Sequence, residues 1–144
     1  MRRTNPRNLR LMEKNLNNIV RVPYKTQEDF FKYWMVFLKP YHFLTVSEML
    51  VASAFLSERY ELSQKISDPD LLDSVLFSEQ VRKRIRESLG LTTMNFQSVL
   101  TRLRKAGVIV NGRINPRYIP NYNGEQSFKL LVMFDRSEDV GAGS

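Results

Sequence analysis

Arginine and lysine residues recur within one stretch of the chain, residues 78–120, at positions that lie between its hydrophobic residues. Guanidinium and ammonium groups in these positions point to solvent and can neutralise the phosphates of a nucleic acid. Clustering of this kind is typical of proteins that bind a polyanion. The candidate phosphate-contacting residues are Arg82, Arg84, Arg86, Arg102, Lys105, Arg113 and Arg117.

A second set of candidate residues lies on the helix predicted for residues 93–106. Its apolar stripe consists of Phe96, Val99, Leu100 and Leu103. At about 100° per residue, the opposite face belongs to polar side chains and one methionine, which could reach base edges. The residues that we assign to this face are Thr93, Met94, Gln97, Ser98 and Thr101.

The chain offers few groups for catalysis. His42 is its single histidine, cysteine is absent, and no Ser/His/Asp set or glycine-rich phosphate loop occurs. Asp68, Asp70 and Asp73 lack the glycine and the closing glutamate of a calcium loop, so we assign them to the start of a helix. We therefore expect no enzyme, no metal and no cofactor.

Two helices joined by a tight turn are expected to position the candidate residues. Ser78 can cap the first helix, residues 79–89, and Gly90 is a natural left-handed stop after it. Thr92 or Thr93 can cap the second helix. The buried face of the first helix would consist of Val81, Ile85 and Leu89.

Extended structure should follow these helices. Val108–Val110 is a β-branched run, and Asn111-Gly112 after it is typical of a type I′ hairpin turn. The Pro- and Asn-rich span 115–127 would form a wing. The alternation of residues in 128–134 predicts a half-buried strand that returns beside the first one.

Residues 78–114, and within them the stretch from Leu89 to Ile109 above all, resemble winged helix-turn-helix regulators of the MarR-like and related types. This stretch has a Leu-Gly-Leu-Thr turn where that family has Leu-Gly-Leu-Ser, and it closes with Leu-x-x-x-Gly-Val-Ile. The resemblance implies a transcriptional or replication regulator whose helix 93–106 enters the major groove of duplex DNA, with the wing against the flanking backbone. Ser98 stands where the family often has arginine or a longer polar side chain, which favours mostly electrostatic binding.

Two more helices are expected upstream of this unit, over residues 27–38 and 45–65. Thr26 can cap the first of them, and Thr45 forms a complete capping box with Glu48 at the start of the second. The aromatic residues of the first helix have helical spacing, which indicates a core face rather than a surface for stacking bases.

The predicted fold class is therefore mainly α with a small antiparallel β-hairpin or sheet. We expect one winged helix-turn-helix domain over residues 22–136, with an added N-terminal helix and its strands between about 108 and 134. Residues 1–21 would form a basic N-terminal arm, and residues 137–144 a flexible tail.

The net charge of +7 is unevenly distributed along the chain. Residues 1–21 carry six basic residues and one acidic residue, and residues 79–136 carry eleven and four; residues 22–78 carry five and eight. No apolar run approaches the ~20 residues that span a bilayer. We expect a cytoplasmic protein of a bacterial or phage-infected host cell that binds nucleic acid, most readily duplex DNA, and no membrane.

Two other functions stay open. A winged helix can serve as an assembly module, for instance in a phage replication, packaging or virion complex, and some small packaging-enzyme (terminase) subunits are similar to this chain in their helix-turn-helix units. A ligand-responsive repressor would need an effector pocket and a dimer interface. Residues 9–38 are the candidate segment for a homo-oligomer or larger assembly, because hydrophobic residues recur there at helical spacing.

Overall fold

The computed structural model describes residues 19–125 and 127–137. They form a mainly helical fold with one small two-stranded antiparallel sheet, as the sequence predicts. The elements are α2 (Gln27–Phe37), α3 (Lys39–His42), α4 (Val46–Ser63), α5 (Pro69–Leu76), α6 (Glu79–Ser88), α7 (Thr93–Lys105), β1 (Ile109–Val110), β2 (Arg113–Ile114) and a 3-10 turn (Pro116–Tyr118).

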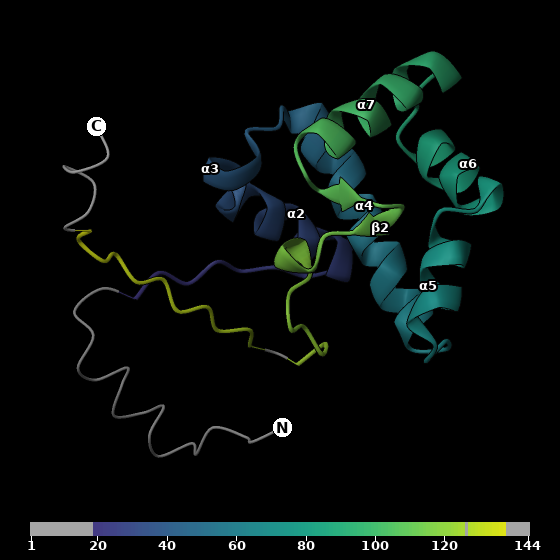
Figure 1. The fold of residues 1–144 in the computed structure, drawn as a ribbon. Coiled ribbons are helices and arrows are strands. Elements are labelled where there is room, and N and C mark those ends of the chain that lie inside the picture. Colours follow the sequence, from purple (N-terminus) through teal and green to yellow (C-terminus); the bar gives the residue numbers. More distant parts are fainter. Residues whose placement is uncertain (1–18, 126, 138–144) are drawn as a thin grey trace.

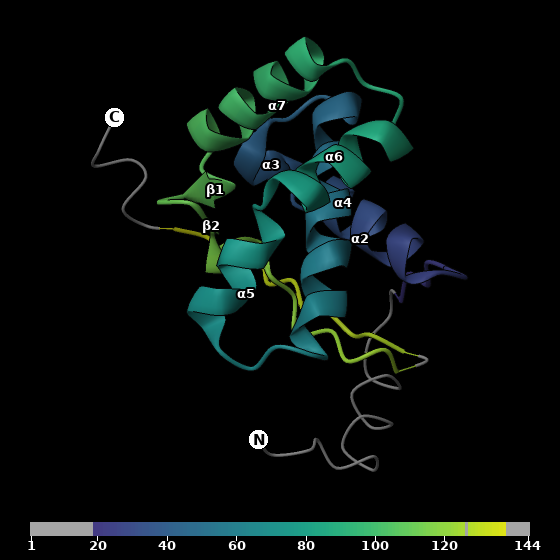
Figure 2. The same cartoon turned by 90° about the vertical axis from the view of Figure 1, so that its right-hand side faces the viewer.

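Helix α4 lies at the centre of the molecule. Helices α2 and α3 lie on one side of it, α5 and α6 on the other, and α7 crosses the top (Figure 1). Figure 2 shows the same arrangement from the side, with α6 in front of α4 and α7 above it. The central helix can pack against its neighbours because Val51, Ala52, Phe55 and Leu56 are buried on it.

The helices begin where the sequence predicts, because side-chain caps fix their first turns. Thr26, Ser78 and Thr92 each accept a hydrogen bond from the backbone N–H three residues further on. Thr45 and Glu48 form the predicted reciprocal capping box at the start of α4. The helix ends lie within two residues of the predicted ones.

His42 is a structural residue at the bend between α3 and α4. Its ring is buried, with 2% of the residue exposed. Nδ1 accepts a hydrogen bond of 2.9 Å from the Leu44 N–H, so Nε2 donates the 2.8 Å bond to the Met35 carbonyl oxygen. The histidine thus joins α2 to the start of α4.

The predicted hairpin turn is present at Asn111-Gly112. Both residues have positive φ, +53° and +72°, as a type I′ turn requires. Val110 pairs with Arg113 and Ile109 with Ile114. The Asn115 side chain donates to the Gly107 carbonyl oxygen at 2.9 Å and so ties the base of the hairpin to the end of α7.

The prediction of a strand within residues 128–134 is wrong. Apart from the Phe128 ring, which packs against α2, residues 128–134 are exposed, and they pair with no strand of the described chain. The strands predicted between 108 and 134 are thus limited to two residues each. The span 115–127 is not an open wing either, because its 3-10 turn buries Tyr118 in the core.

Some predictions concern residues outside the described part of the chain. These are most of the basic arm, residues 1–18, with the first third of the candidate oligomerisation segment, and most of the tail, residues 138–144. Within the described residues, no helix has the length and hydropathy that crossing a membrane would require.

Candidate nucleic-acid interface

The turn between α6 and α7 sets the angle at which the two helices present their side chains. Gly90, with φ of +66°, ends α6: its N–H donates to the Glu87 carbonyl oxygen at 3.1 Å, and the next N–H, of Leu91, donates to the Arg86 carbonyl oxygen at 3.0 Å. These two bonds form a Schellman motif, which closes a helix at a left-handed residue. Thr92 then caps α7.

Helix α7 presents one polar face to solvent along its whole length. Its opposite face is buried through Phe96, Leu100 and Leu103. Met94, near the start, is 79% exposed, which is unusual for a large apolar side chain on a well-packed helix. The residues assigned to this face from the sequence, Thr93, Met94, Gln97, Ser98 and Thr101, are all exposed, and so is the candidate phosphate-contacting residue Lys105.

A hollow of about 190 Å³ lies between α6 and this face of α7. The hollow is basic on balance, because three cations and one carboxylate line it. The Arg82 Nε is buried and has no hydrogen-bond partner among the described residues, although the residue was expected to point outward. The lining residues are Glu79, Arg82, Lys83, Arg86, Thr93, Phe96 and Gln97.

Arg84 is held by an ion pair within the molecule. Its Nη2 and Nε bond to the two carboxylate oxygens of Glu58 in α4 at 2.7 and 3.1 Å. This hydrogen bonding, together with the charge of Glu58, raises the pKa of the Arg84 guanidinium above its ordinary value. Arg84 therefore links α6 to α4 rather than reaching freely into solvent.

Two further candidate arginines pair in the same way with acidic residues of other helices. Arg102 Nε lies 3.8 Å from a Glu48 carboxylate oxygen, at the start of α4. Arg113 pairs with Asp70 and, at 3.5 Å, with Asp73, so the hairpin is tied to α5. Pairs exposed to this degree contribute only ~0–1 kcal/mol, so an incoming phosphate can compete for the guanidinium.

Arg86 lies at the turn itself. Its Nη1 donates to the Leu91 carbonyl oxygen at 3.4 Å, and its Nη2 lies 3.9 Å from a Glu87 carboxylate oxygen. The side chain therefore supports the α6–α7 turn at the same time as it lines the hollow.

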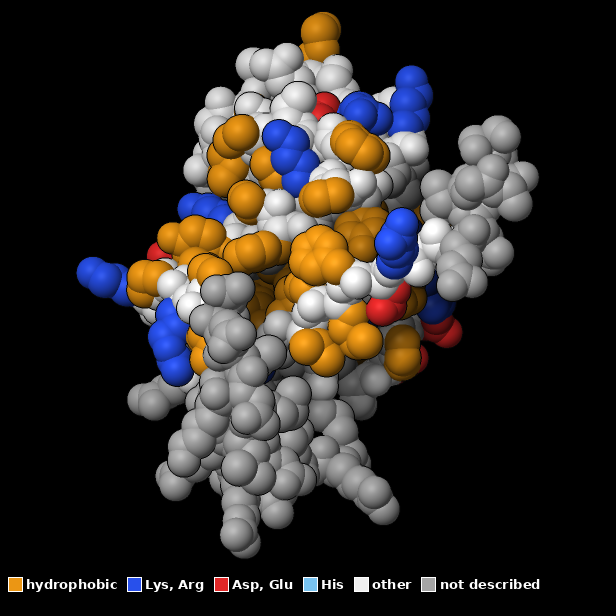
Figure 3. Space-filling model, turned by 90° about the vertical axis from the view of Figure 1, so that its left-hand side faces the viewer, with side chains coloured by type: hydrophobic (Ala, Val, Ile, Leu, Met, Phe, Trp, Pro, Cys, Tyr) orange, Lys and Arg blue, Asp and Glu red, His pale blue; other side chains and the backbone are white. Residues whose placement is uncertain are grey.

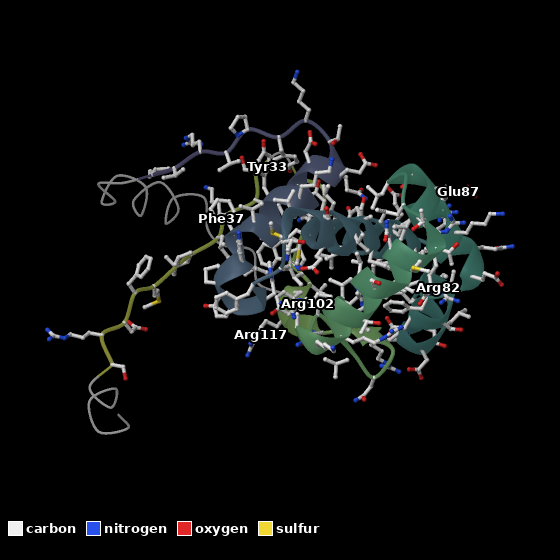
Figure 4. All side chains as sticks on the ribbon, turned by 90° about the horizontal axis from the view of Figure 1, so that it is seen from above. Tyr33, Phe37, Arg82, Glu87, Arg102 and Arg117 are labelled. Carbon is white, nitrogen blue, oxygen red and sulfur yellow. The ribbon has the colours of Figure 1, made fainter. Side chains whose placement is uncertain are left out.

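Other cations have no ion-pair partner within the described part of the chain. They include Lys83 in α6 and both Arg104 and Lys105 at the end of α7. Arg117 lies over the Tyr41 ring, 5.9 Å from its centroid. Figure 4 shows Arg82 toward one end of α7, and Arg102 and Arg117 toward the other.

Lys83 and Arg104 were missed when candidate residues were chosen from the sequence. Helical geometry could have found them: at about 100° per residue, Arg104 lies on the flank of α7 that carries Gln97 and Thr93. That flank borders the hollow, whose lining includes Lys83. Which of the neighbouring arginines would be paired depends on contacts with α4 and α5, and helical periodicity carries no information about those.

A second hollow of about 120 Å³ lies beside α2 and α4 and includes Arg59, whose buried Nε also lacks a hydrogen-bond partner in the described residues. It is smaller than the ~300–1,000 Å³ of typical small-molecule pockets.

Comparison of the chain with family models, curated proteins and solved structures found no match. The MarR-like resemblance therefore stays a prediction.

Proposed function

We propose that the chain is a DNA-binding protein of the winged helix-turn-helix type, acting as a transcriptional or replication regulator. Helices α4, α6 and α7 would form its three-helix core, and the β1–β2 hairpin would be a short wing. One observation carries the proposal: the polar face of α7 is open to solvent along its length, with unpaired cations at its end and in the neighbouring hollow.

Helix α7 would lie in the major groove. Met94, Gln97, Ser98 and Thr101 would meet base edges, and among them Gln97 is the side chain that can donate and accept at an adenine. The Thr101 hydroxyl already donates to the Gln97 carbonyl oxygen at 3.0 Å. Because the face has few strong base readers, binding would be governed mainly by charge.

Phosphates would be contacted on both sides of α7. Lys105 and Arg104 would act at its end, and Lys83 with Arg82 at the hollow that both of them line. Arg84, Arg102 and Arg113 would contribute less, because each would first have to leave a carboxylate.

The test is a fluorescence-anisotropy titration of the full chain with random duplex DNA over a series of salt concentrations. We expect Lys105→Ala and Arg104→Ala each to weaken binding to all sequences alike and to flatten the slope of log affinity against log salt by about one unit. Arg84→Ala should change the slope less, because its charge is already neutralised by Glu58.

Lys65→Ala is the matched control. It removes the same charge from an exposed residue just after α4 and should leave the slope unchanged, because the C-terminal end of α4 lies away from α7 (Figure 1). A shallow slope for the unmodified chain, or equal effects of the Lys105 and Lys65 substitutions, would count against the proposal.

An assembly role, such as a component of a phage replication, packaging or virion complex, is the second candidate. It is favoured by a specific observation: large apolar side chains are exposed on α2, around α3 and in residues 130–134. Exposure on this scale is typical of protein–protein contact surfaces. The two functions are compatible, since the exposed polar face of α7 belongs to neither apolar region.

A further inference from the structure

Residues 130–134, here called the apolar arm, are five consecutive large hydrophobic residues that the fold leaves uncovered. Their exposed fractions run from 49% for Leu130 to 96% for Phe134. In extended chain, successive side chains point to opposite sides, so both sides of the arm are apolar. Burying both sides needs two surfaces. The members of the arm are Leu130, Leu131, Val132, Met133 and Phe134.

A second uncovered surface, here called the α2–α3 face, lies on the same chain. Tyr33, Val36 and Phe37 share one side of α2 at i, i+3 and i+4, and Figure 4 shows Tyr33 and Phe37 on it. Figure 3 shows hydrophobic side chains gathered across this side of the molecule. The other members are Tyr41, Phe43 and Val46, which are 63%, 72% and 67% exposed.

Phe43 marks this face as more than incidental exposure. It has φ of +55°, a left-handed conformation that costs a non-glycine residue about 1 kcal/mol or more. The strain holds an aromatic ring out in water. Phe43 is the C-cap of α3, where a left-handed residue closes the helix, and residues in this conformation also occur at binding surfaces.

We infer that two copies of this chain associate by exchanging their apolar arms, each arm packing on the α2–α3 face of the other copy. The position of Phe128, two residues before the arm, supports this geometry. Phe128 packs on α2, with ring centroids 4.9 Å from Phe30 and 6.0 Å from Trp34, so each arm leaves its own domain beside its own α2. An arm lying between the two copies can bury one row of side chains against each.

The area available fits a stable dimer. With about 150–200 Å² for a fully exposed large side chain, the arm and the face each expose on the order of 600 Å². Two reciprocal pairings would remove on the order of 2,000 Å² from water, which is the range of obligate homodimers.

Sedimentation equilibrium of the full chain at about 1 to 100 µM tests the inference. The unmodified chain should be a dimer. An arm variant, Leu131→Asp with Phe134→Asp, and a face variant, Val36→Asp with Phe43→Asp, should both be monomers, with at least a hundredfold weaker association. Both variants should keep the far-ultraviolet circular dichroism of the parent, because all four side chains are exposed.

Leu71→Asp is the control. It adds one aspartate at a 51% exposed leucine on α5 and should leave the dimer intact. An equal mixture of the arm and face variants should form a heterodimer, because one intact arm and one intact face remain. A monomeric parent chain, variants as dimeric as the control, or a mixture that contains only monomers would each overturn arm exchange.

Discussion

Tyr122 connects the segment after the hairpin to the helical core. Its ring stacks on Phe30 with centroids 4.1 Å apart, and Tyr60 and Phe31 lie against it at 5.1 and 5.5 Å. Burial, followed by the hydrogen bond and charge of Tyr24, raises the pKa of Tyr122 to about 12. A single side chain thus gives the fold a dependence on alkaline pH.

The pKa of Tyr122 gives a prediction with a definite sign. Since its folded-state pKa lies above the unfolded value of 10.0, the folded chain holds this proton more tightly. The corresponding stability is fully present below pH 10 and is lost as the pH rises toward about 12. Urea unfolding between pH 9 and 12 should therefore show a steeper loss for the parent than for Tyr122→Phe.

The control for this prediction is Tyr33→Phe. Tyr33 is 43% exposed and outside this cluster, so, compared in the background of the monomeric arm variant, its substitution should change the dependence of stability on pH less than Tyr122→Phe does. Identical curves for the parent and Tyr122→Phe would show that the phenol is not perturbed by the fold.

Single residues also mark how far the sequence could predict the site. The caps at Ser78 and Thr92 and the turn at Asn111 were predictable, because each depends on neighbours a few residues away. The pairing of Arg84 with Glu58 joins residues 26 apart in sequence, and nothing local indicates it. The sequence could therefore predict which basic residues are exposed, but not which of them form an ion pair with another helix.

At the scale of elements, the α6–turn–α7 unit depends on one backbone conformation. A Cβ at Gly90 would meet nothing within 4 Å, so a substitution there costs only the strain of positive φ.

Gly90→Ala should therefore lower the free energy of unfolding by about 1 kcal/mol, because alanine resists the left-handed conformation. Gly90→Asn should lower it by less, since asparagine tolerates that conformation better. Urea unfolding at neutral pH measures both. Equal losses for alanine and asparagine would mean that the backbone strain at this position is not the cause.

Two features of the chain explain why residues 128–134 do not form the predicted strand. Residues 128–134 were interpreted as alternating, yet Leu131 and Met133 are apolar as well, so the run lacks a polar side. Sheet formation also needs a free edge, and the hairpin supplies strands of only two residues. The 3-10 turn at Pro116–Tyr118 was missed because its Tyr118 is recruited by the core from a segment of otherwise turn-forming residues.

In the molecule as a whole, the basic surface of α6 and α7 and the exposed apolar surface of α2 and α3 lie on different sides. Helices α6 and α7, which carry the polar face and the hollow, lie at the top and upper right of Figure 1, and helices α2 and α3, which carry the apolar face, lie at the left. The concentration of positive charge in residues 79–136 was evident from composition. The apolar surface was not, because the aromatic spacing of α2 that predicted a core face also places Tyr33 and Phe37 outside it.

Association would make thermal stability depend on concentration. If two copies bind only when folded, the melting temperature of the parent should rise with protein concentration by mass action. The arm variant Leu131→Asp with Phe134→Asp should melt at one temperature across the same series. Differential scanning fluorimetry over a hundredfold range of concentration distinguishes the two, and a parent curve that does not move would argue against association.

Trp34, the single tryptophan of the chain, lies on α2 and contacts both the 3-10 turn and the segment after it. Its indole N–H donates to the Tyr118 carbonyl oxygen at 2.8 Å, and its ring meets Phe128 edge-on. Because Trp34 is part of α2 and packs against the core, its fluorescence reports on the contact between α2 and the segment after the hairpin. During unfolding, a shift of this emission to longer wavelength before the helices are lost would show that the segment separates from α2 as a distinct step.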